Sequence, residues 1–395
     1  MRIYLDHNAT TPVDPLVLEA IMPALSDTFG NPSSVHHFGQ QAKASVDRAR
    51  GAVAALVGAE PSEIVFTSGG TEANNLAIRG VAEASERAGR RQLVTSGIEH
   101  EAVLNTFKAL ARRGWDTTIL PVDASGIVSP DALREAVSDR TALVSLMHAN
   151  NEIGTVQPVA ELAAIAHDHG ALFHTDAVQS TGKIPVDARR LGVDLLSLSG
   201  HKFYGPKGVG ALWIRRGTRL VQGLTGGRQE RNRRAGTENV PSIVGAGAAA
   251  ELALQRLEPE GARQAALRDR LEARVLDTTP GTAVNGARQP RVPNTTNISF
   301  DRVEAESLLI ALDLEGVAVS TGSACSSGTL EPSHVLRAMG LSTHRTQSSI
   351  RFSLGASTTE AEIDQIVALL PRVVEKLRSL VGAGASGRPW RPGRS

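Results

Sequence analysis

Residues 64–71, Ile-Val-Phe-Thr-Ser-Gly-Gly-Thr, place a short run of β-forming residues directly before two glycines and a hydroxyl residue. We predict a strand over Ile64–Thr67, a turn at 68–70 and a helix over Thr71–Arg87. Two glycines and a hydroxyl at the start of a helix can bind a phosphate group, although an ordinary tight turn between a strand and a helix has the same composition. The segment lacks the Gly-Lys-Ser/Thr ending of a nucleotide-binding P-loop.

The same alternation of strands and helices continues over residues 63–215. This pattern predicts an α/β fold with a mostly parallel sheet and helices on both of its faces. Ligands of such sheets bind beyond the carboxyl ends of the strands. No Gly-x-Gly-x-x-Gly segment follows the first strand, which argues against a nicotinamide cofactor. Further strands are expected at 93–95, 117–120, 143–146, 172–174, 195–198 and 211–214, and helices at 101–112, 130–137 and 158–169.

A second, smaller pattern of strands and helices follows a long loop predicted at 223–239. We expect a large domain over residues 16–258 and a small domain formed by 1–15 together with 259–380. Residues 381–395, rich in Gly, Pro and Arg, are expected to form a flexible tail. Pro371 should kink or restart the last helix. The elements predicted after the loop are helices at 242–257, 261–276, 304–314 and 359–380 and strands at 296–300, 317–319 and 349–354.

Composition excludes several classes of protein. The 395 residues carry a net charge of +1, which gives no global attraction to nucleic acid, and no apolar run reaches the ~18 residues of a membrane-spanning helix. The first residues lack the apolar stretch of a signal peptide, so we expect a cytoplasmic protein. Cys325 is the only cysteine, which excludes an internal disulfide and a cysteine-based metal site, and no metal is predicted.

A lysine and an aspartate stand out because each follows a predicted strand. Lys202 lies in Ser199-Gly200-His201-Lys202, where its amine could form a Schiff base with a carbonyl, although most lysines are solvated surface groups. Asp176 follows the strand at 172–174 and could keep a ring nitrogen protonated or simply cap a helix. Together, a lysine and a carboxylate at the ends of two strands are the pair that a pyridoxal phosphate site requires.

Three more residues have both a functional and a structural interpretation. His100, just beyond a strand, could stack on a flat cofactor or move protons, or it could be a satisfied structural histidine. Cys325 lies in the small-residue stretch 322–328, which favours an accessible, reactive thiol over a tolerated small residue. Arg351 is a charge on a strand predicted to be buried, and its partner could be a substrate carboxylate or an internal acid.

Eight segments together resemble the cysteine desulfurases, which are pyridoxal phosphate enzymes of the class V aminotransferase group. The segments at 234–239 and 322–325 are similar to the branch that serves nitrogen fixation and iron–sulfur assembly. The resemblance implies the fold type I architecture: a large domain with a mostly parallel, seven-stranded sheet and a smaller α+β C-terminal domain. The segments occur in the family's order over nearly the whole chain, at 4–12, 66–72, 148–154, 174–179, 199–202, 234–239, 322–325 and 349–354.

The resemblance also implies roles for single residues. Lys202 would hold the cofactor covalently and move protons, Asp176 would pair with the ring nitrogen, and Gln179 would contact the ring hydroxyl. His100 would stack on the ring and assist proton transfer. Cys325 would attack the sulfur of the bound cysteine. The other implied contacts are to the cofactor phosphate (Gly70, Thr71, Ser199, His201, and Thr237 toward the other subunit of a homodimer) and to the substrate carboxylate (Asn151 and Arg351).

These similarities predict an L-cysteine desulfurase that releases L-alanine and leaves a persulfide on Cys325. A transient protein acceptor, such as an iron–sulfur scaffold, would then take the sulfur. No direct nucleic-acid or membrane partner is expected. The nearest alternative is a selenocysteine lyase or a small-molecule aminotransferase of the same fold, and an aminotransferase would not need Cys325. A catalytically silent binding partner is a further alternative, against which the presence of both Lys202 and Cys325 argues.

Overall fold

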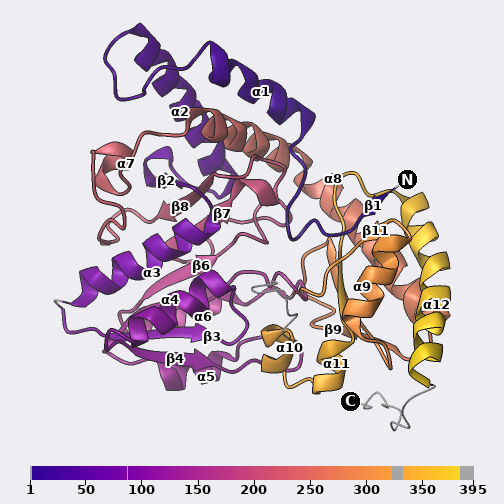
Figure 1. Cartoon of the computed structure of the whole chain (residues 1–395). Coiled ribbons are helices and arrows are strands. Elements are labelled where there is room, and N and C mark those ends of the chain that lie inside the picture. The colour runs from indigo at the N-terminus through magenta and orange to yellow at the C-terminus, as the bar shows by residue number, and fades with distance from the viewer. Residues whose placement is uncertain (1, 87, 323–331, 383–395) are drawn as a thin grey trace.

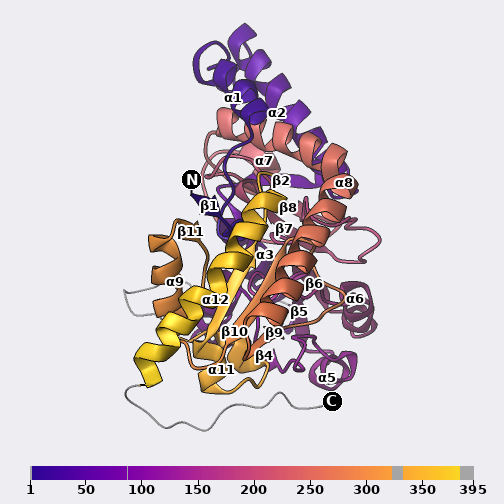
Figure 2. The ribbon, with the colours of Figure 1, turned by 90° about the vertical axis from the view of Figure 1, so that its right-hand side faces the viewer.

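The computed structural model describes residues 2–86, 88–322 and 332–382. Its helices and strands gather into two parts that lie side by side (Figures 1 and 2). Within the described residues, one part holds a seven-stranded sheet, and the other holds a three-stranded and a two-stranded sheet. The long helix α8 (Val240–Thr278) packs against elements of both parts.

The large sheet is mostly parallel. Its strands follow the order β2-β8-β7-β6-β5-β3-β4. Strands β3 to β7 pair in parallel, whereas β8 runs antiparallel to both of its neighbours. The predicted α/β fold with a mostly parallel, seven-stranded sheet is therefore confirmed. The strand bounds are β2 (Ile64–Thr67), β3 (Gln92–Ser96), β4 (Asp116–Leu120), β5 (Thr141–Ser145), β6 (Leu172–Asp176), β7 (Leu195–Ser199) and β8 (Gly210–Ile214).

Successive side chains of these strands pack into two different cores. Val94 and Val144 belong to one cluster of buried apolar residues, and their neighbours Leu93 and Leu143 belong to another. Because side chains alternate across a strand, the continuous apolar runs of the sequence belong to strands that are buried on both faces. One face is covered by α3 (Gly70–Glu86) and α4 (Glu101–Ala111), and the other by α2 (His37–Leu56), α5 (Pro130–Ala136) and α6 (Val159–Asp168).

The smaller part joins segments from both ends of the chain. An antiparallel sheet has the order β12-β10-β9, and β1 pairs in parallel with β11. Their buried apolar side chains form a third core with the helices α9 and α12. The N-terminal residues therefore lie beside residues more than 300 positions later. The bounds are β1 (Ile3–Tyr4), β9 (Thr282–Asn285), β10 (Thr295–Phe300), α9 (Ala305–Leu314), β11 (Val317–Ala318), β12 (Ser349–Ser353) and α12 (Glu360–Gly382).

Helix α8 corrects the prediction of two helices at 242–257 and 261–276, because the expected break does not occur. Pro259, inside the helix, removes one backbone hydrogen bond at a cost of about 3 kcal/mol. Before it, Ile243 and Ala250 lie in the core of the large part, and after it, Leu267 and Leu271 lie in the core of the small part. Each buried leucine or isoleucine contributes roughly 1.5–3 kcal/mol, so burial on both sides outweighs the break.

Helix α12 likewise continues through Pro371 without restarting, with Leu370 and Val374 buried beside it. Helices α1 and α2 pack on α8 and form the upper end of the molecule in Figure 1. In the described ranges no helix combines the length and apolarity needed to cross a membrane. The remaining elements are α1 (Pro15–Ser26), η1 (Pro61–Glu63), η2 (Gly200–Lys202), α7 (Gln229–Asn232), α10 (His334–Ala338) and α11 (Thr343–Gln347).

Candidate active site

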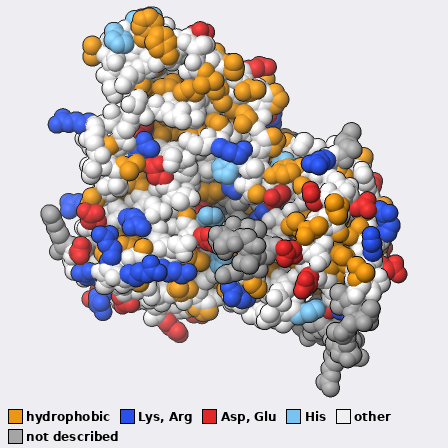
Figure 3. Space-filling model, viewed as in Figure 1, with side chains coloured by type: hydrophobic (Ala, Val, Ile, Leu, Met, Phe, Trp, Pro, Cys, Tyr) orange, Lys and Arg blue, Asp and Glu red, His pale blue; other side chains and the backbone are white. Residues whose placement is uncertain are grey.

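A cavity of about 290 Å³ lies at the carboxyl ends of β6 and β7. On the face drawn in Figure 3, histidine and charged side chains gather near the middle, between the two parts. The cavity is bordered by nine of the twelve residues that the sequence predicts for the site: Gly70, Thr71, His100, Asn151, Asp176, Gln179, Ser199, His201 and Lys202. Ala9, Asn74, Met147, Ala149 and Val178 also line it.

The parallel sheet explains why these residues meet. Asp176 is the last residue of β6, and Lys202 lies in the short 3-10 turn that follows β7. Strands β6 and β7 are parallel neighbours, so their carboxyl ends share one edge of the sheet. His100 follows β3 at the same edge and begins α4.

The amine of Lys202 is partly buried. Its Nζ donates hydrogen bonds to the backbone oxygens of Asn8 and Ala9, the latter at 2.7 Å. Burial, with a contribution from the Arg351 cation, lowers the pKa of Lys202 to about 8. A larger fraction of this amine is therefore neutral and nucleophilic near neutral pH than is usual for lysine.

The carboxylate of Asp176 is held in place by two donors. Its Oδ1 accepts from the backbone nitrogen of Val178 at 2.9 Å, and its Oδ2 accepts from Nδ2 of Asn74 at 2.7 Å. Sequence reasoning missed Asn74. Its spacing of four residues from Gly70, on the same face of α3, is the signal that could have found it.

The start of α3 also borders the cavity and presents hydrogen-bond donors. Helix α3 begins at Gly70, and the first N–H groups of a helix have no partner within the helix. A Cβ at Gly70 would lie 2.8 Å from Cγ2 of Val178, so only glycine allows this close approach. The hydroxyls of Thr71 and Ser199 border the same space. Burial, then the nearby cation of Lys202, lowers the pKa of His201 to about 4, which keeps that imidazole neutral.

This donor set fits pyridoxal phosphate. The start of α3 with its hydroxyl neighbours suits a phosphate group. Asp176 can pair with a protonated pyridine nitrogen, and the Lys202 amine can bond to an aldehyde. All three lie around one cavity.

His100 has a structural and a chemical use at once. Its Nδ1 accepts a hydrogen bond from the backbone nitrogen of Ala102 at 3.0 Å, which caps α4. In the neutral ring the proton is therefore assigned to Nε2. Both interpretations of His100 from the sequence are compatible with this geometry, because the capping bond leaves Nε2 available to a ligand.

Glu99, which precedes His100, is a buried acid that the sequence analysis missed. Its Oε1 accepts from Oγ of Ser96 at 2.6 Å and from the backbone nitrogen of Met147 at 3.0 Å. Burial, with a smaller contribution from the Asp176 charge, raises the pKa of Glu99 to about 8. Its protonated form is therefore well populated at neutral pH.

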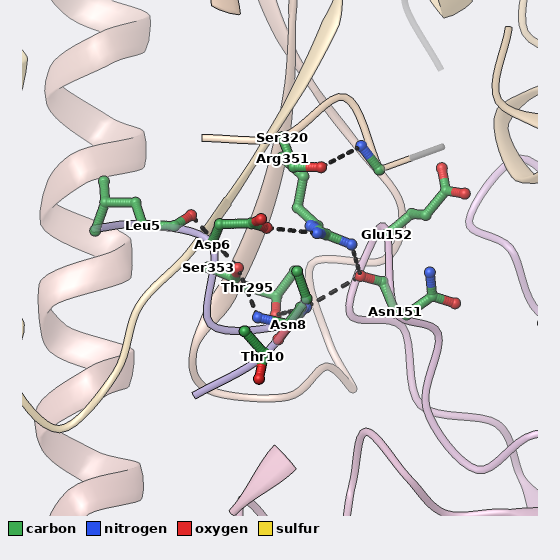
Figure 4. Close-up of polar contacts among 12 residues, drawn as sticks. Leu5, Asp6, Asn8, Thr10, Asn151, Glu152, Thr295, Ser320, Arg351 and Ser353 are labelled. Carbon is green, nitrogen blue, oxygen red and sulfur yellow. Dashed lines mark hydrogen bonds and ion pairs between the residues drawn. The ribbon is translucent and has the colours of Figure 1, made fainter. Parts of the chain in front are cut away.

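Arg351 does not border the cavity but contacts Asn151, which does (Figure 4). Its Nη2 donates to Oδ1 of Asp6 at 2.6 Å, and its Nη1 donates to the backbone oxygen of Asn151 at 3.0 Å. The guanidinium is almost fully buried, with 5% of its side chain exposed. The structure thus contains the internal salt bridge that was one of the two sequence interpretations.

Asn8, also missed from the sequence, links Asn151 to the small part. Its Nδ2 donates to the backbone oxygen of Asn151 at 3.0 Å and to Oγ1 of Thr295 at 2.8 Å (Figure 4). The last two predicted residues lie elsewhere. Thr237 borders a separate cavity of about 140 Å³, and Cys325 lies outside the described residues.

Comparison with known proteins assigns nearly the whole chain to one family. Residues 3–366 match the family model described as aminotransferase class-V. The chain belongs to the class-V aminotransferase family. A curated relative, the cysteine desulfurase IscS of Dictyoglomus turgidum, is 51% identical over 379 residues, which cover 96% of each protein.

Solved structures of this family agree with that placement. A NifS-like protein is 39% identical, with a TM-score of 0.88 over 97% of this chain and 100% of that one. A structure described as SspA in complex with cysteine is 38% identical, with a TM-score of 0.79 over 90% of this chain and 99% of that one. The predicted similarity to cysteine desulfurases, the fold type I architecture and the pyridoxal phosphate cofactor are confirmed.

Proposed function

We propose that this class-V aminotransferase family member converts L-cysteine to L-alanine, taking the sulfur onto Cys325 and passing it to a protein acceptor. The observation that carries the proposal is that the Lys202 amine, the Asp176 carboxylate and the start of α3 surround one cavity. Supporting this substrate, curated relatives of about half identical sequence are named cysteine desulfurases, and one related structure is described as a complex with cysteine.

When bound, pyridoxal phosphate supplies an electron sink for the negative charge that develops at the substrate Cα. Asp176, oriented by Asn74, would hold the ring nitrogen in its protonated form. Lys202 would bind the aldehyde and carry the Cα proton, because its lowered pKa of about 8 lets the amine both accept and release a proton. His100 can move a second proton at Nε2, since Nδ1 is engaged with α4.

Asn151 and Arg351 receive the substrate carboxylate in this proposal. Nε of Arg351 is buried and has no hydrogen-bond partner among the described residues, so the guanidinium keeps a donor beyond those used by Asp6 and Asn151. A buried guanidinium favours a carboxylate because it can make charge-assisted, directional bonds to it. A substrate carboxylate would compete with Asp6 for this group.

Sulfur transfer requires a thiol, and Cys325 is the only one in the chain. The Cys325 thiolate attacks the substrate sulfur, so that a sulfur–sulfur bond forms while the substrate Cβ–S bond breaks. Cβ receives a proton and becomes the methyl group of alanine. The products are L-alanine and a persulfide on Cys325, and a thiol acceptor or reductant then restores the enzyme.

We further propose a homodimer. Seven large apolar side chains on or near α1 and the start of α2 are about half exposed or more, and such a patch is unusual on a monomer. The resemblance implies that Thr237 contacts the cofactor phosphate of the other subunit in such a dimer. Sedimentation at micromolar concentration would reveal a monomer if this is wrong. The patch comprises Leu16, Leu18, Met22, Leu25, Phe29, Val35 and Phe38.

The acceptor and the location are inferred from chemistry. The reaction needs Cys325 as a free thiol at the start of each cycle, and thiols stay reduced in the cytoplasm, so we infer a cytoplasmic protein. The similarity of segments 234–239 and 322–325 to the iron–sulfur branch favours a scaffold protein as acceptor. Transfer of labelled sulfur from the charged enzyme to a candidate scaffold, compared with a thiol-free version of that scaffold, tests this step.

The experiment that tests the proposed reaction measures alanine released from L-cysteine by the holoenzyme with a reductant present. We expect alanine from the wild type and none from Cys325→Ala, a substitution that removes the only thiol. Alanine from both proteins would favour a selenocysteine lyase, and a keto acid in place of alanine would favour an aminotransferase. No visible absorption band after addition of pyridoxal phosphate would favour a silent binding partner.

A further inference from the structure

Lys183 is a second lysine beside the cavity, and the proposed reaction gives it no role. It follows Gln179 by four residues, in the turns after β6. Its Nζ donates to Oε1 of Gln179 at 2.6 Å and to Oδ1 of Asn8 at 2.8 Å. Both acceptors are neutral amide oxygens, which is an unusual setting for a lysine whose amine is buried.

The surrounding hydrogen bonds fix the direction in which each amide faces. Because Lys183 donates to both side chains, their oxygens rather than their nitrogens must face it. Nε2 of Gln179 then donates to the backbone oxygen of Asn8 at 3.0 Å. Oδ1 of Asn8 also accepts from Nδ2 of Asn294 at 3.0 Å, while its Nδ2 donates to the backbone oxygen of Asn151. Turning either amide around would bring two donors together.

This arrangement decides what Gln179 can offer to a ligand. The amide nitrogen carries two N–H groups, and the backbone of Asn8 takes one of them. Gln179 borders the cavity, so its second N–H is the polar group available there. An N–H donor suits an oxygen that bears negative charge, and the ionised ring hydroxyl of pyridoxal phosphate is such an oxygen.

The charges around Lys183 do not disturb this arrangement. Burial, followed by the cations of Lys202 and Arg351, holds the pKa of Lys183 well below its usual range. Burial and the Lys183 charge together lower the pKa of the nearby His7 to about 4, so that ring is neutral. A neutral amine still has two N–H groups, so Lys183 can make both of its hydrogen bonds in either protonation state.

We propose that Lys183 is a positioning residue: by holding the oxygen of the Gln179 amide, it directs the amide NH2 group to the cavity, so that the site favours the ionised ring oxygen of the cofactor. The proposal rests on the proposed contact between Gln179 and the cofactor ring. A donor at the ring oxygen stabilises the deprotonated form of the lysine-bound cofactor, in which that oxygen carries the most negative charge. Lys183 therefore lowers the pH at which the visible absorption band changes.

The test is a pH titration of the visible band of the holoenzyme. Lys183→Met keeps a similar length and removes the donor, and Lys43→Met, on the exposed face of α2, is the matched control. We expect Lys183→Met to raise the midpoint by about one pH unit and to weaken cofactor binding about tenfold, the size of one lost hydrogen bond to a charged oxygen. Lys43→Met should leave both quantities unchanged. Lys183→Arg keeps hydrogen-bond donors, so its midpoint should lie close to the wild-type value.

A second variant keeps the proposal testable if Lys183→Met does not fold. Gln179→Met should raise the midpoint by a similar amount, and the double variant should shift it no further, because the two residues act as one unit. The proposal would be overturned if Lys183→Met has the wild-type midpoint or if the shifts add up in the double variant. If Lys183→Met does not fold, a wild-type midpoint in Gln179→Met would overturn it. A wild-type protein without a visible band would instead overturn the proposed cofactor site, and this inference with it.

Discussion

The two sides of the cavity are built in different ways. The side that we assign to the cofactor consists of Gly70, Thr71, Asp176, Ser199 and Lys202, and each of them is the last residue of a strand of the large sheet or lies within a few residues after one. The side that we assign to the substrate carboxylate consists of Asn151, which borders the cavity, and of Asp6, Asn8 and Arg351, which are hydrogen-bonded to Asn151 or to one another outside the cavity lining. These four residues come from three distant segments. We call these the cofactor side and the carboxylate side.

The carboxylate side depends on contacts between residues that are far apart in sequence. Asn8 bonds to Asn151 and Thr295, which are 143 and 287 positions away, and Arg351 bonds to Asp6 across 345 positions. The cofactor side, by contrast, is positioned by the backbone pairing of neighbouring strands. Substitutions on the cofactor side should therefore remove single chemical functions, whereas those on the carboxylate side should also loosen the link between the two parts.

The largest effect is expected at Lys202. Lys202→Ala removes the amine that bonds to the cofactor, so the visible band should be lost and alanine formation should fall by at least about a thousandfold. Absorbance and alanine release check this, with Lys207→Ala, an exposed lysine of the same loop, as the control. A normal visible band in Lys202→Ala would contradict the assignment.

A smaller and graded effect is expected at Asp176 and its partner. Asp176→Asn removes the charge that pairs with the ring nitrogen, and kcat should fall roughly 100- to 1000-fold. Asn74→Ala leaves that charge but removes one donor to it, and kcat should fall about tenfold, as is usual for a residue that orients a functional group. Near-normal turnover in Asp176→Asn would refute the role of this carboxylate.

On the carboxylate side, the effect should appear in substrate binding. Arg351→Ala should raise KM roughly 10- to 100-fold, because a carboxylate loses charge-assisted hydrogen bonds. Asp6→Asn breaks the salt bridge but keeps the guanidinium, so KM should stay near the wild-type value or fall. If both variants raise KM equally, or if Arg351→Ala leaves KM unchanged, the role of Arg351 is limited to its salt bridge with Asp6.

The smallest effect couples the two sides through charge. Only the neutral amine of Lys202 attacks an aldehyde, so the rate at which the apoenzyme takes up pyridoxal phosphate should rise with pH and level off above about 8. The Arg351 cation lowers the pKa of Lys202, so Arg351→Ala should raise the pKa and move the inflection to higher pH. Stopped-flow absorbance measures both curves. An inflection that does not move would show that the Arg351 charge does not affect the pKa of Lys202.

The same contrast explains what could be predicted from the sequence. Most strands of the large sheet are short apolar runs bounded by turns, and the cofactor side follows because parallel strands end at one edge. Asn8 and Lys183 could not be identified in this way, because their roles depend on contacts that only the folded chain creates. Helix α8 was divided wrongly because the packing of its two halves into separate cores has no local signal in the sequence.

The most direct test of the central claim is the mass of the peptide that contains Cys325 after the holoenzyme has reacted with L-cysteine without reductant. The account predicts that this peptide gains one sulfur atom in the wild type, that alanine is released in the same amount, and that both are absent in Lys202→Ala. The sample must first be shown to be free of reductant. Release of alanine while the Cys325 peptide keeps its original mass would then contradict sulfur transfer through this cysteine.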